Sequence, residues 1–590
     1  MVSSVCEAPC VLLDAAGAGD FGRSWRFSGY VETLQALESA EIAPLLSTVE
    51  ASAADGLHAV GFISYEAATG LNPDLPAVPP LEGLPLAWFA LFRERTEAAA
   101  GEEPVPEPAA SPILKPDLGP GRYLDTVGRI QEYIARGDTY QVNYTFGMNG
   151  VFSGDPLRLY REIARGQRAS FNAYIDTGRF AVISASPELF FSLKDRLIRV
   201  RPMKGTARRG RWAEEDGLQV SRLKGSPKER AENLMIVDLL RNDLGIVAET
   251  GSVKVESLFE VETYPTLHQM TSTVSATVRE GVGLAEIMAA LFPCGSVTGA
   301  PKRRSMEIVE ELESGPRGVY CGAVGYVAPG GEALFSVAIR TLLYDRGKRQ
   351  LSLGIGSGIT TDSVAQDEYL ECMTKAGFLF PKAEDFCLIE SLRLENGAYS
   401  LLERHLERLR NSARYFGFTL DEEAVKVALG RQSEGKSGVH KVRLLAARNG
   451  EFALSSEPLA SSDSLLKFVI SDRRVDSTDV FRFHKTTCRD LLDSARAERP
   501  GVDEVVFLNE RGELAEGSYH SLLLRINGTM MTPKLDSGLL PGVMRQELLE
   551  RGEAVESTLF ASDLAKTDEI WLINSVRGMR RAVYVEGEST

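Results

Sequence analysis

Two stretches of the sequence each place a pair of glutamates one helical turn apart. The first pair follows a capping box around Pro227, so a helix is expected from about residue 227. Carboxylates on two helices could hold Mg²⁺, which prefers hard oxygen ligands and keeps positions open for water and substrate. Each pair taken alone is better interpreted as ordinary surface glutamates. The pairs are Glu229 with Glu232 and Glu368 with Glu371.

A single lysine, Lys204, lies between a Pro-Met pair and a Gly-Thr turn in "RVRPMKGTARRG", residues 199–210. It is either one more charge in a solvated basic strip or a buried amine that does chemistry. A nucleophilic amine must be unprotonated, so burial or neighbouring cations would have to lower its pKa. The flanking arginines either supply that field or face solvent along a strand. They are Arg199, Arg201, Arg208 and Arg209.

Two glycine-rich stretches, residues 294–305 and 353–359, could offer backbone N–H groups to an anion, because glycine lets the main chain approach closely. Neither follows a dinucleotide-binding or P-loop pattern, and each read singly could equally be a turn. His268 taken alone is more often a satisfied core histidine than a catalyst.

A second set of reactive residue types occurs toward the C-terminus, where Lys485 lies at a predicted strand-to-helix junction, Glu516 follows a predicted hairpin and Arg408 lies on a predicted amphipathic helix. A pyridoxal phosphate enzyme needs a lysine for the Schiff base, a carboxylate at the ring nitrogen and a cation for the phosphate. By composition alone, these three residues are unremarkable surface types.

The elements that must position these residues alternate between strand-like and helical patterns, which predicts an α/β and α+β multidomain protein. A Pro-, Ala- and Glu-rich stretch at residues 97–112 is typical of an extended connector, and a second break falls at residues 380–386. The predicted organisation is an N-terminal subregion 1–96, a linker 97–115, a catalytic domain 116–380 and a C-terminal domain 386–590.

The bulk composition narrows the class of function. The 590-residue chain has a formal charge of -16, which argues against nucleic acid or an anionic membrane as a partner. Seven cysteines without CxxC pairs favour reduced thiols, and hence the cytoplasm, over a disulfide framework or zinc site. We find no secretory signal pattern and no long apolar run, so neither secretion nor membrane insertion is expected.

Taken in order, several motifs resemble the chorismate-utilising enzymes, specifically the aminodeoxychorismate synthase component I family. They include "QVNYTF", "SPELFF", "RPMKGT", "RAENLMIVDLLRNDLG", "CGSVTGAPKRRS" and "GIGSGITTDSVAQDEYLECMTKA"; "GFISYEAA" near residue 61 extends the likeness more weakly. The resemblance covers residues 120–380. It implies Mg²⁺ bound by Glu232 and Glu371 with support from Glu229 and Glu368, a general acid or base at Glu188, His268 near the leaving group, and substrate contacts from Thr298, Arg340, Lys375 and the Gly356 to Gly358 loop.

The resemblance also makes Lys204 the discriminating position. Anthranilate synthases are similar but carry a small residue there, whereas aminodeoxychorismate synthases carry lysine in "PIKGT"; here Met203 replaces the isoleucine. The lysine would attack C2 of chorismate as the 4-hydroxyl leaves, before ammonia enters at C4. No cysteine lies in a glutaminase-type elbow, so a separate glutamine amidotransferase subunit is expected to supply ammonia.

Residues 386–585 resemble the fold-type IV pyridoxal phosphate enzymes, which include branched-chain and D-amino acid aminotransferases and aminodeoxychorismate lyase. The motifs are "LLERHLERL", "HKTT", "ELAEGSYHSLLL", "MTPKLDSGLLPGVMRQ" and "EIWLINSVRGM". The resemblance implies that Lys485 holds the cofactor, Glu516 pairs with its ring nitrogen, Arg408 binds its phosphate with help from Gly542, Val543 and Ser575, and Ser391 relays a proton.

Two departures from that family stand out. The asparagine usual after the glutamate is replaced in "SYHS", Ser518 to Ser521, and the short N-terminal strands of stand-alone enzymes are absent. The combined expectation is a bifunctional enzyme that aminates chorismate and then eliminates pyruvate to give 4-aminobenzoate for folate. The alternative is anthranilate synthase component I fused to an aminotransferase-like or non-catalytic docking domain.

Overall fold

The computed structural model divides into two compact units, which are described separately. The second unit contains residues 384–590 and also a short segment, residues 210–218, taken from within the first. Most of the predicted linker 97–115 and the predicted break near residue 380 lie outside the described residues. The structure describes residues 9–15, 23–76, 78–98, 112–379, 386–460 and 464–586.

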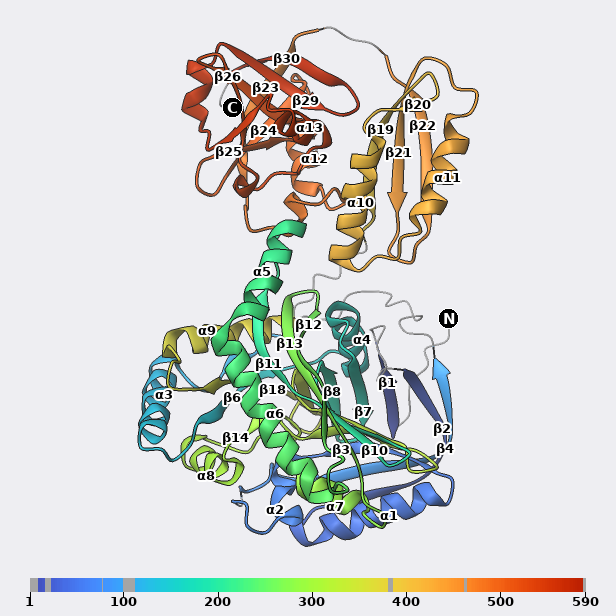
Figure 1. The fold of residues 1–590 in the computed structure, drawn as a ribbon, viewed down its shortest axis with the longest axis vertical. Coiled ribbons are helices and arrows are strands. Elements are labelled where there is room, and N and C mark those ends of the chain that lie inside the picture. Colours follow the sequence, from blue (N-terminus) through green and yellow to red (C-terminus); the bar gives the residue numbers. More distant parts are fainter. Residues whose placement is uncertain are drawn as a thin grey trace. The chain divides into compact units, whose positions relative to one another are not determined.

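The first unit is built on an extended antiparallel sheet system (Figure 1). The N-terminal strand β1 pairs with β7, and β3 pairs with β15. Residues before and after the predicted linker therefore share one sheet. The strands are β1 (Cys10–Asp14), β2 (Ser24–Ala36), β3 (His58–Ile63), β4 (Ala87–Ala98), β5 (Lys115–Pro116), β6 (Gln141–Val151), β7 (Phe171–Asp176), β8 (Phe180–Ser186), β9 (Leu189–Lys194), β10 (Leu197–Arg201), β11 (Met203–Arg208), β12 (Lys254–Thr263), β13 (Leu267–Thr277), β14 (Gly299–Ala300), β15 (Ala323–Val327), β16 (Ala333–Val337), β17 (Thr341–Asp345) and β18 (Gln350–Ile359).

Helices cover these strands and carry the predicted glutamates. Ser226 caps α6, where its hydroxyl accepts a hydrogen bond from the Glu229 backbone N–H at 3.3 Å, as the capping box predicts. Helix α6 packs on β11 and β13, and α9 packs on β18. The helices are α1 (Ile42–Ala54), α2 (Ala68–Leu71), α3 (Pro120–Ala135), α4 (Pro156–Gln167), α5 (Ala213–Gly225), α6 (Pro227–Val247), α7 (Leu284–Leu291), α8 (Lys302–Leu312) and α9 (Ala365–Ala376).

The stretch predicted as a glycine loop around Gly356 and Gly358 is instead an interior part of strand β18. It pairs with β6 along its whole length, with Gly356 opposite Thr145 and Gly358 opposite Asn143. The glycines serve close packing rather than a turn, because a side chain at Gly356 would collide with the Tyr144 carbonyl at 2.5 Å. The prediction of a loop was therefore wrong, although the glycines do let the backbone pack closely against its neighbours.

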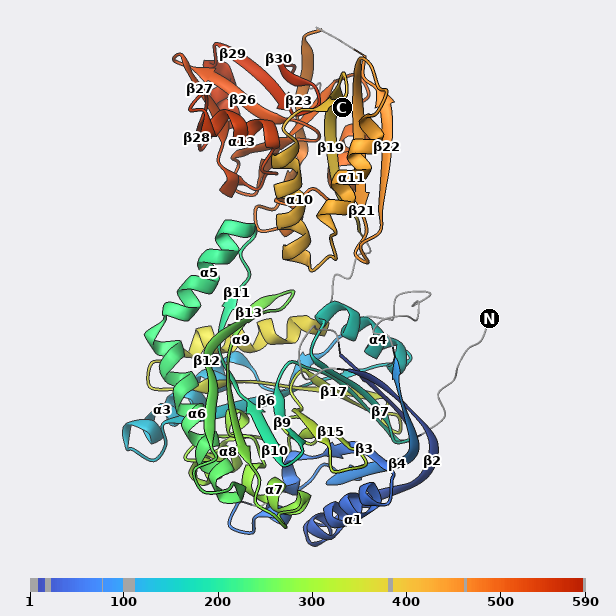
Figure 2. The same cartoon turned by 45° about the vertical axis from the view of Figure 1, so that its right-hand side comes forward.

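Among its described residues, the second unit contains two sheets. Helices α10 and α11 lie on the smaller one (Figure 2), and α12 and α13 lie on the larger one (Figure 1). The smaller sheet is antiparallel, whereas β23 pairs in parallel with both β24 and β30. The elements are β19 (Leu388–Glu395), β20 (Ala398–Tyr399), α10 (Leu402–Phe416), α11 (Glu422–Ser433), β21 (Val439–Ala446), β22 (Phe452–Pro458), β23 (Leu466–Val475), α12 (Asp490–Ala497), β24 (Glu504–Asn509), β25 (Leu514–Gly517), β26 (Ser521–Ile526), β27 (Thr529–Pro533), α13 (Val543–Glu550), β28 (Val555–Ser557), β29 (Glu569–Asn574) and β30 (Gly578–Tyr584).

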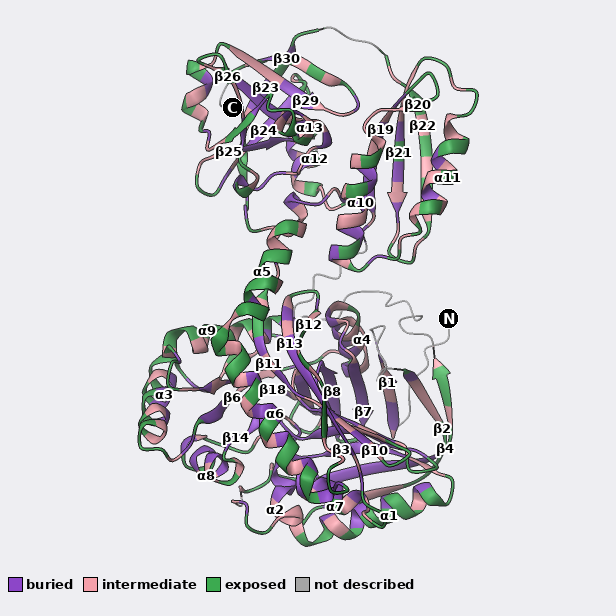
Figure 3. Ribbon diagram, viewed as in Figure 1, coloured by how far each residue is buried: buried purple, intermediate pink, exposed green. Residues whose placement is uncertain are grey.

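Apolar residues fill the space between sheets and helices in each unit, and Figure 3 shows the strands of the first unit as largely buried. The expected mixture of sheets and flanking helices is confirmed. No helix in the described ranges is both long and apolar enough to cross a membrane.

The cysteines depart in part from the expectation of reduced thiols. Cys10 is engaged in a disulfide, which the absence of CxxC pairs did not indicate. The free thiols within the described part of the chain are Cys294, Cys321, Cys372, Cys387 and Cys488.

Candidate functional site

Lys204 lies in β11 and is half-buried rather than fully exposed. A Cβ added to Gly358 would lie 3.0 Å from the Lys204 Nζ and 2.4 Å from the side-chain Nε2 of Gln141. The lysine amine therefore lies directly against strand β18 at Gly358. Burial lowers the pKa of Lys204, and the neighbouring Lys375 lowers it further.

The arginines that flank Lys204 in sequence are directed elsewhere. Arg199 forms an ion pair with Glu256 at 3.2 Å, and Arg201 forms one with Glu262. Arg209 donates to the Tyr264 carbonyl at 3.0 Å. The cation that most affects Lys204 is Lys375, which comes from a distant part of the sequence.

Gln141 is a residue of this site that sequence reasoning missed. Its side chain is buried, and its Nε2 has no hydrogen-bond partner among the described residues. It opens the strand β6 that pairs with β18. A polar side chain that opens the strand "QVNYTF" was the available signal.

Glu188 lies just before β9 and is buried, with 2% of its surface exposed. Burial raises its pKa to about 7, although a hydrogen bond from Ser296 and the charge of Lys204 both oppose that rise. Its Oε1 has no hydrogen-bond partner within the described ranges. A carboxyl group with this pKa can give or take a proton near neutral pH.

The four predicted metal ligands lie on α6 and α9, and their charges interact. Burial raises the pKa of Glu229, and Glu232 raises it further. Burial also raises the pKa of Glu232, against the effect of Lys204. Carboxylates that repel one another, three of them half-buried and Glu371 exposed, are a donor set suited to a divalent cation. As the described side chains stand, however, no three or more potential ligands form a metal-holding group.

Lys375 links helix α9, which carries Glu371, to strand β18, which carries Gly356. Its Nζ donates to the Gly356 carbonyl at 3.0 Å and pairs with Glu371 Oε1 at 2.8 Å. Burial would raise the pKa of Glu371, but the charge and hydrogen bond of Lys375, together with the charges of Lys204 and Lys228, lower the pKa overall. The lysine therefore neutralises one of the predicted metal ligands.

Three further predicted residues have distinct surroundings. Arg340 adopts a positive φ of 50°, and its Nη1 is buried without a partner in the described part of the chain. Burial lowers its pKa. Thr298 is fully buried and donates to the Cys294 carbonyl at 3.2 Å. His268 is buried in β13, with its Nδ1 3.0 Å from the Thr263 hydroxyl.

In the second unit, the predicted cofactor residues line one cavity of about 310 Å³. Burial lowers the pKa of Lys485 to about 7, assisted by Arg408 and Arg489. Burial raises the pKa of Glu516, whose Oε2 accepts a hydrogen bond from the Leu540 N–H at 3.1 Å. The cavity lining includes Ser391, Arg408, Lys485, Glu516, Gly542, Val543 and Ser575.

Arg408 is held in place by Glu390. Its Nε and Nη2 donate to the two carboxylate oxygens at 2.8 Å and 2.7 Å, and its Nη1 donates to the Pro541 carbonyl at 3.2 Å. His405 also contacts this carboxylate at 2.6 Å. The guanidinium is thus fixed beside Gly542, where a Cβ would lie 2.7 Å from the Ser521 hydroxyl.

The segment Ser518 to Ser521, where the sequence departs from the pattern of the fold-type IV enzymes, is held by a buried glutamate that the sequence analysis did not single out. Glu504 is fully buried and accepts hydrogen bonds from the backbone N–H groups of Ser518 at 2.9 Å and Tyr519 at 3.1 Å. His520 Nδ1 lies 2.5 Å from the same carboxylate. The signal was a single acidic residue leading an apolar strand. The side chains of this segment line the cavity, and the Nε2 of His520 is buried without a hydrogen-bond partner among the described residues.

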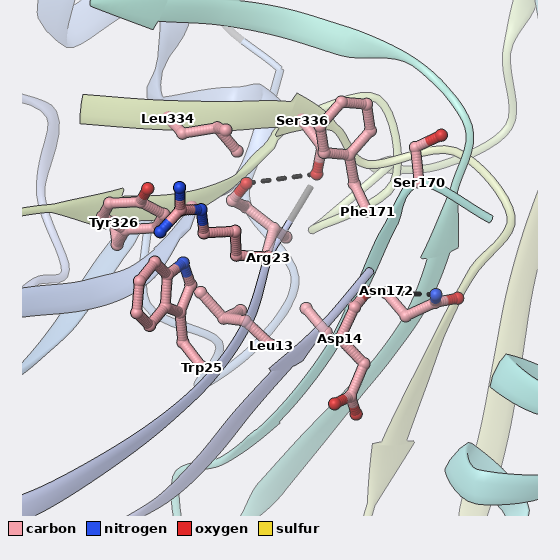
Figure 4. A pocket seen from close by; sticks show the side chains of 13 residues that line it. Leu13, Asp14, Arg23, Trp25, Ser170, Phe171, Asn172, Tyr326, Leu334 and Ser336 are labelled. Carbon is pink, nitrogen blue, oxygen red and sulfur yellow. Dashed lines mark hydrogen bonds between the residues drawn. The ribbon is translucent and has the colours of Figure 1, made fainter. Parts of the chain in front are cut away.

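A small pocket of the first unit lies away from these residues, between β1, β7, β15 and β16 (Figure 4). Trp25, Tyr326 and Phe171 surround it, and Ser336 donates to the Val324 carbonyl at 3.1 Å. Its volume of about 40 Å³ suits little more than a water molecule. None of the predicted site residues lines it.

The fold and the site agree with comparisons to known proteins. Residues 8–381 match the model of the chorismate binding enzymes. That match spans more than half of the sequence, so the chain belongs to the chorismate binding enzyme family. Residues 387–584 match the class IV amino-transferases. The two resemblances expected from sequence are therefore confirmed at the level of family and fold.

Individual relatives include both types of synthase. Over 262 residues the chain is 44% identical to aminodeoxychorismate synthase component 1 of Klebsiella aerogenes, which covers 44% of this chain and 58% of that protein. It is 41% identical over 262 residues to anthranilate synthase component 1 of Aquifex aeolicus, covering 44% of this chain and 53% of that protein. The chain thus spans little more than half the length of these relatives.

A solved structure supports the fold of the first unit. The anthranilate synthase component I from Streptococcus pneumoniae aligns with a TM-score of 0.54 and 25% identity, covering 62% of this chain and 93% of that one. Because relatives of both types align well, overall similarity does not choose between the two reactions.

Proposed function

We propose that the chain makes 4-aminobenzoate in two steps, amination of chorismate at C4 in the first unit and elimination of pyruvate in the second. The observation that carries this proposal is the half-buried Lys204 amine beside Gly358 in a family whose substrate is chorismate. Ammonia comes from a separate glutamine amidotransferase subunit.

In the first step, the unprotonated Lys204 amine forms a bond to C2 while the bond from C4 to its hydroxyl breaks. Glu188 gives a proton to the departing hydroxide, which leaves as water. Ammonia then bonds to C4 and the lysine departs from C2, so one hard displacement becomes two easier ones. The lowered pKa of Lys204 favours the neutral amine, and the raised pKa of Glu188 favours the protonated carboxyl, as this step needs.

The surrounding residues bind and orient chorismate. Arg340 and Lys375 meet its carboxylates, Thr298 lines the pocket, and His268 lies toward the leaving group. Mg²⁺, when bound, neutralises a substrate carboxylate. Glu232 and Glu371 would hold it, with Glu229 and Glu368 in support, since hard carboxylate oxygens suit this ion.

In the second step, pyridoxal phosphate supplies an electron sink when bound. Lys485 would hold it and move protons, which its pKa of about 7 permits near neutral pH. Glu516 would pair with its ring nitrogen, and the Ser391 hydroxyl would relay the proton that ends the elimination. Arg408, Ser575 and the backbone of Gly542 and Val543 would bind its phosphate.

The test is product analysis of the pure protein given chorismate, ammonium and Mg²⁺, with and without pyridoxal phosphate. We expect aminodeoxychorismate without the cofactor and 4-aminobenzoate with it. Anthranilate as the product would refute the first step, and persistence of aminodeoxychorismate in the presence of cofactor would refute the second.

A further inference from the structure

The motif "GFISYEAA" lines a second cavity in the first unit, which the proposed reaction does not use. This cavity has a volume of about 320 Å³ and is bounded by Tyr65 and Glu66 on one side and by Glu313 and Arg317 on the other. The cavity is large enough for a small ligand with its water.

Glu66 is an unusual residue to find in the lining of a cavity, because it is a buried carboxylate. It is 5% exposed, and its Oε1 accepts the backbone N–H groups of Arg317 at 2.7 Å and Gly318 at 3.1 Å. Its Oε2 has no partner among the described residues, and neither does the buried hydroxyl of Tyr65. A buried carboxylate oxygen without a partner costs free energy, so the site calls for a hydrogen-bond donor or a cation.

Arg317, which also lines the cavity, does not supply the missing hydrogen-bond donor. Arg317 donates to both oxygens of Glu313, at 2.9 Å and 2.7 Å, and to two backbone carbonyls. This buried pair is mutually neutralised, so Arg317 acts on Glu66 through its charge and its backbone N–H, while the Oε2 of Glu66 has no hydrogen-bond partner among the described residues. Consistent with this, burial raises the pKa of Glu66 to about 7.

The cavity lies close behind the strands that hold chorismate in the proposed function. Arg317 Nη2 donates to the Asn143 carbonyl at 2.8 Å and its Nη1 to the Val297 carbonyl at 2.7 Å. Asn143 is the partner of Gly358, the residue beside the Lys204 amine. One guanidinium and one strand pair therefore separate the cavity from the reacting amine.

We infer that this cavity is a binding site for an ammonium ion, held by the Glu66 carboxylate and the Tyr65 hydroxyl. Ammonium offers four N–H donors to oxygen acceptors, whereas an alkali cation of similar size offers none. The use of the ion rests on the proposed function, because the bound ammonium would be the nitrogen source for amination at C4. Binding of the ion does not depend on that function.

The first test is binding, which needs no turnover. Thermal unfolding of the full chain is compared in ammonium chloride, potassium chloride and tetramethylammonium chloride at equal ionic strength. We expect ammonium alone to raise the unfolding temperature of the parent chain and to lose this effect in Glu66→Gln. That substitution preserves the acceptor for the two backbone N–H groups but turns the free oxygen into a donor. Equal stabilisation by potassium, or an unchanged ammonium effect in the variant, would overturn the site.

The second test is kinetic and uses ammonium as nitrogen donor. We expect Glu66→Gln to raise the KM for ammonium about tenfold or more, with the KM for chorismate unchanged. Tyr65→Phe should raise it in the same direction and serves if the first variant does not fold. Glu82→Gln, at an exposed glutamate, is the matched control. An unchanged KM for ammonium contradicts the inference, whereas a parent chain that forms no aminated product contradicts the proposed function.

Discussion

At the scale of single residues, one lysine in each unit is prepared for chemistry by its surroundings. Lys204 has a lowered pKa because it is buried near Lys375. We expect Lys204→Ala to abolish amination of chorismate at C4, measured as aminodeoxychorismate formed from chorismate and ammonium. Lys224→Ala, at an exposed position on α5, is the control for loss of a surface charge. A parent rate in Lys204→Ala would show that the covalent role is wrong.

Lys485 allows a prediction about pH, since its pKa is lowered to about 7 by burial and by Arg408 and Arg489. Only the neutral amine bonds to the cofactor aldehyde, so uptake should be fast above pH 7 and slow below it. At one unit below the pKa about a tenth of the amine is neutral, so uptake at pH 6 should be roughly tenfold slower than at pH 8. The absorbance change on mixing measures this. Lys485→Ala should show no such change and no borohydride-fixed cofactor.

At the scale of elements, strand β18 depends on glycine where it passes the Lys204 amine. A Cβ at Gly358 would meet Gln141 at 2.4 Å and Lys204 at 3.0 Å. We expect Gly358→Ala to lower kcat/KM for chorismate by about a hundredfold, because a small displacement of a reacting group has effects of that size. Gly245→Ala on α6 meets no atom within 4 Å and is the control. Equal activity in both variants would contradict the close approach.

Helix α10 and strand β19 are joined by the buried carboxylate of Glu390. Burial alone would raise its pKa, but Arg408 and His405 lower it to about 2. Because the folded-state pKa lies below the unfolded value, this group stabilises the fold above about pH 4.5, and the contribution is lost as pH falls toward 2. Glu390→Gln should therefore cost about 3 kcal/mol at pH 7 and less at pH 3, measured by urea unfolding. Glu403→Gln, at an exposed position on α10, should cost little.

At the scale of the whole molecule, two units carry two independent sets of chemical groups. We expect Lys485→Ala to retain chorismate amination and to accumulate aminodeoxychorismate. Lys204→Ala should still convert supplied aminodeoxychorismate to 4-aminobenzoate. Pyridoxal phosphate should raise the unfolding temperature of one thermal transition only, because a ligand stabilises the unit that binds it. Loss of both activities in either variant would contradict this independence.

The amino-acid sequence by itself determined the local features, because these depend on neighbours a few residues apart. The capping box at Ser226, the amphipathic helix with Arg408 and the order of motifs that marks both families were all readable. The sequence could not show that Gly356 and Gly358 lie within a strand. That placement depends on pairing with β6, a distant part of the chain, in which Asn143 lies opposite Gly358. It also could not show that Lys375, rather than the adjacent arginines, is the main cation acting on Lys204, or that Glu504 supports the unusual segment at Ser518. Burial, charge neighbours and unpaired polar atoms arise only when distant segments pack together. Only the tertiary structure therefore decided the direction in which the pKa of each lysine shifts and which oxygen of Glu66 lacks a partner among the described residues.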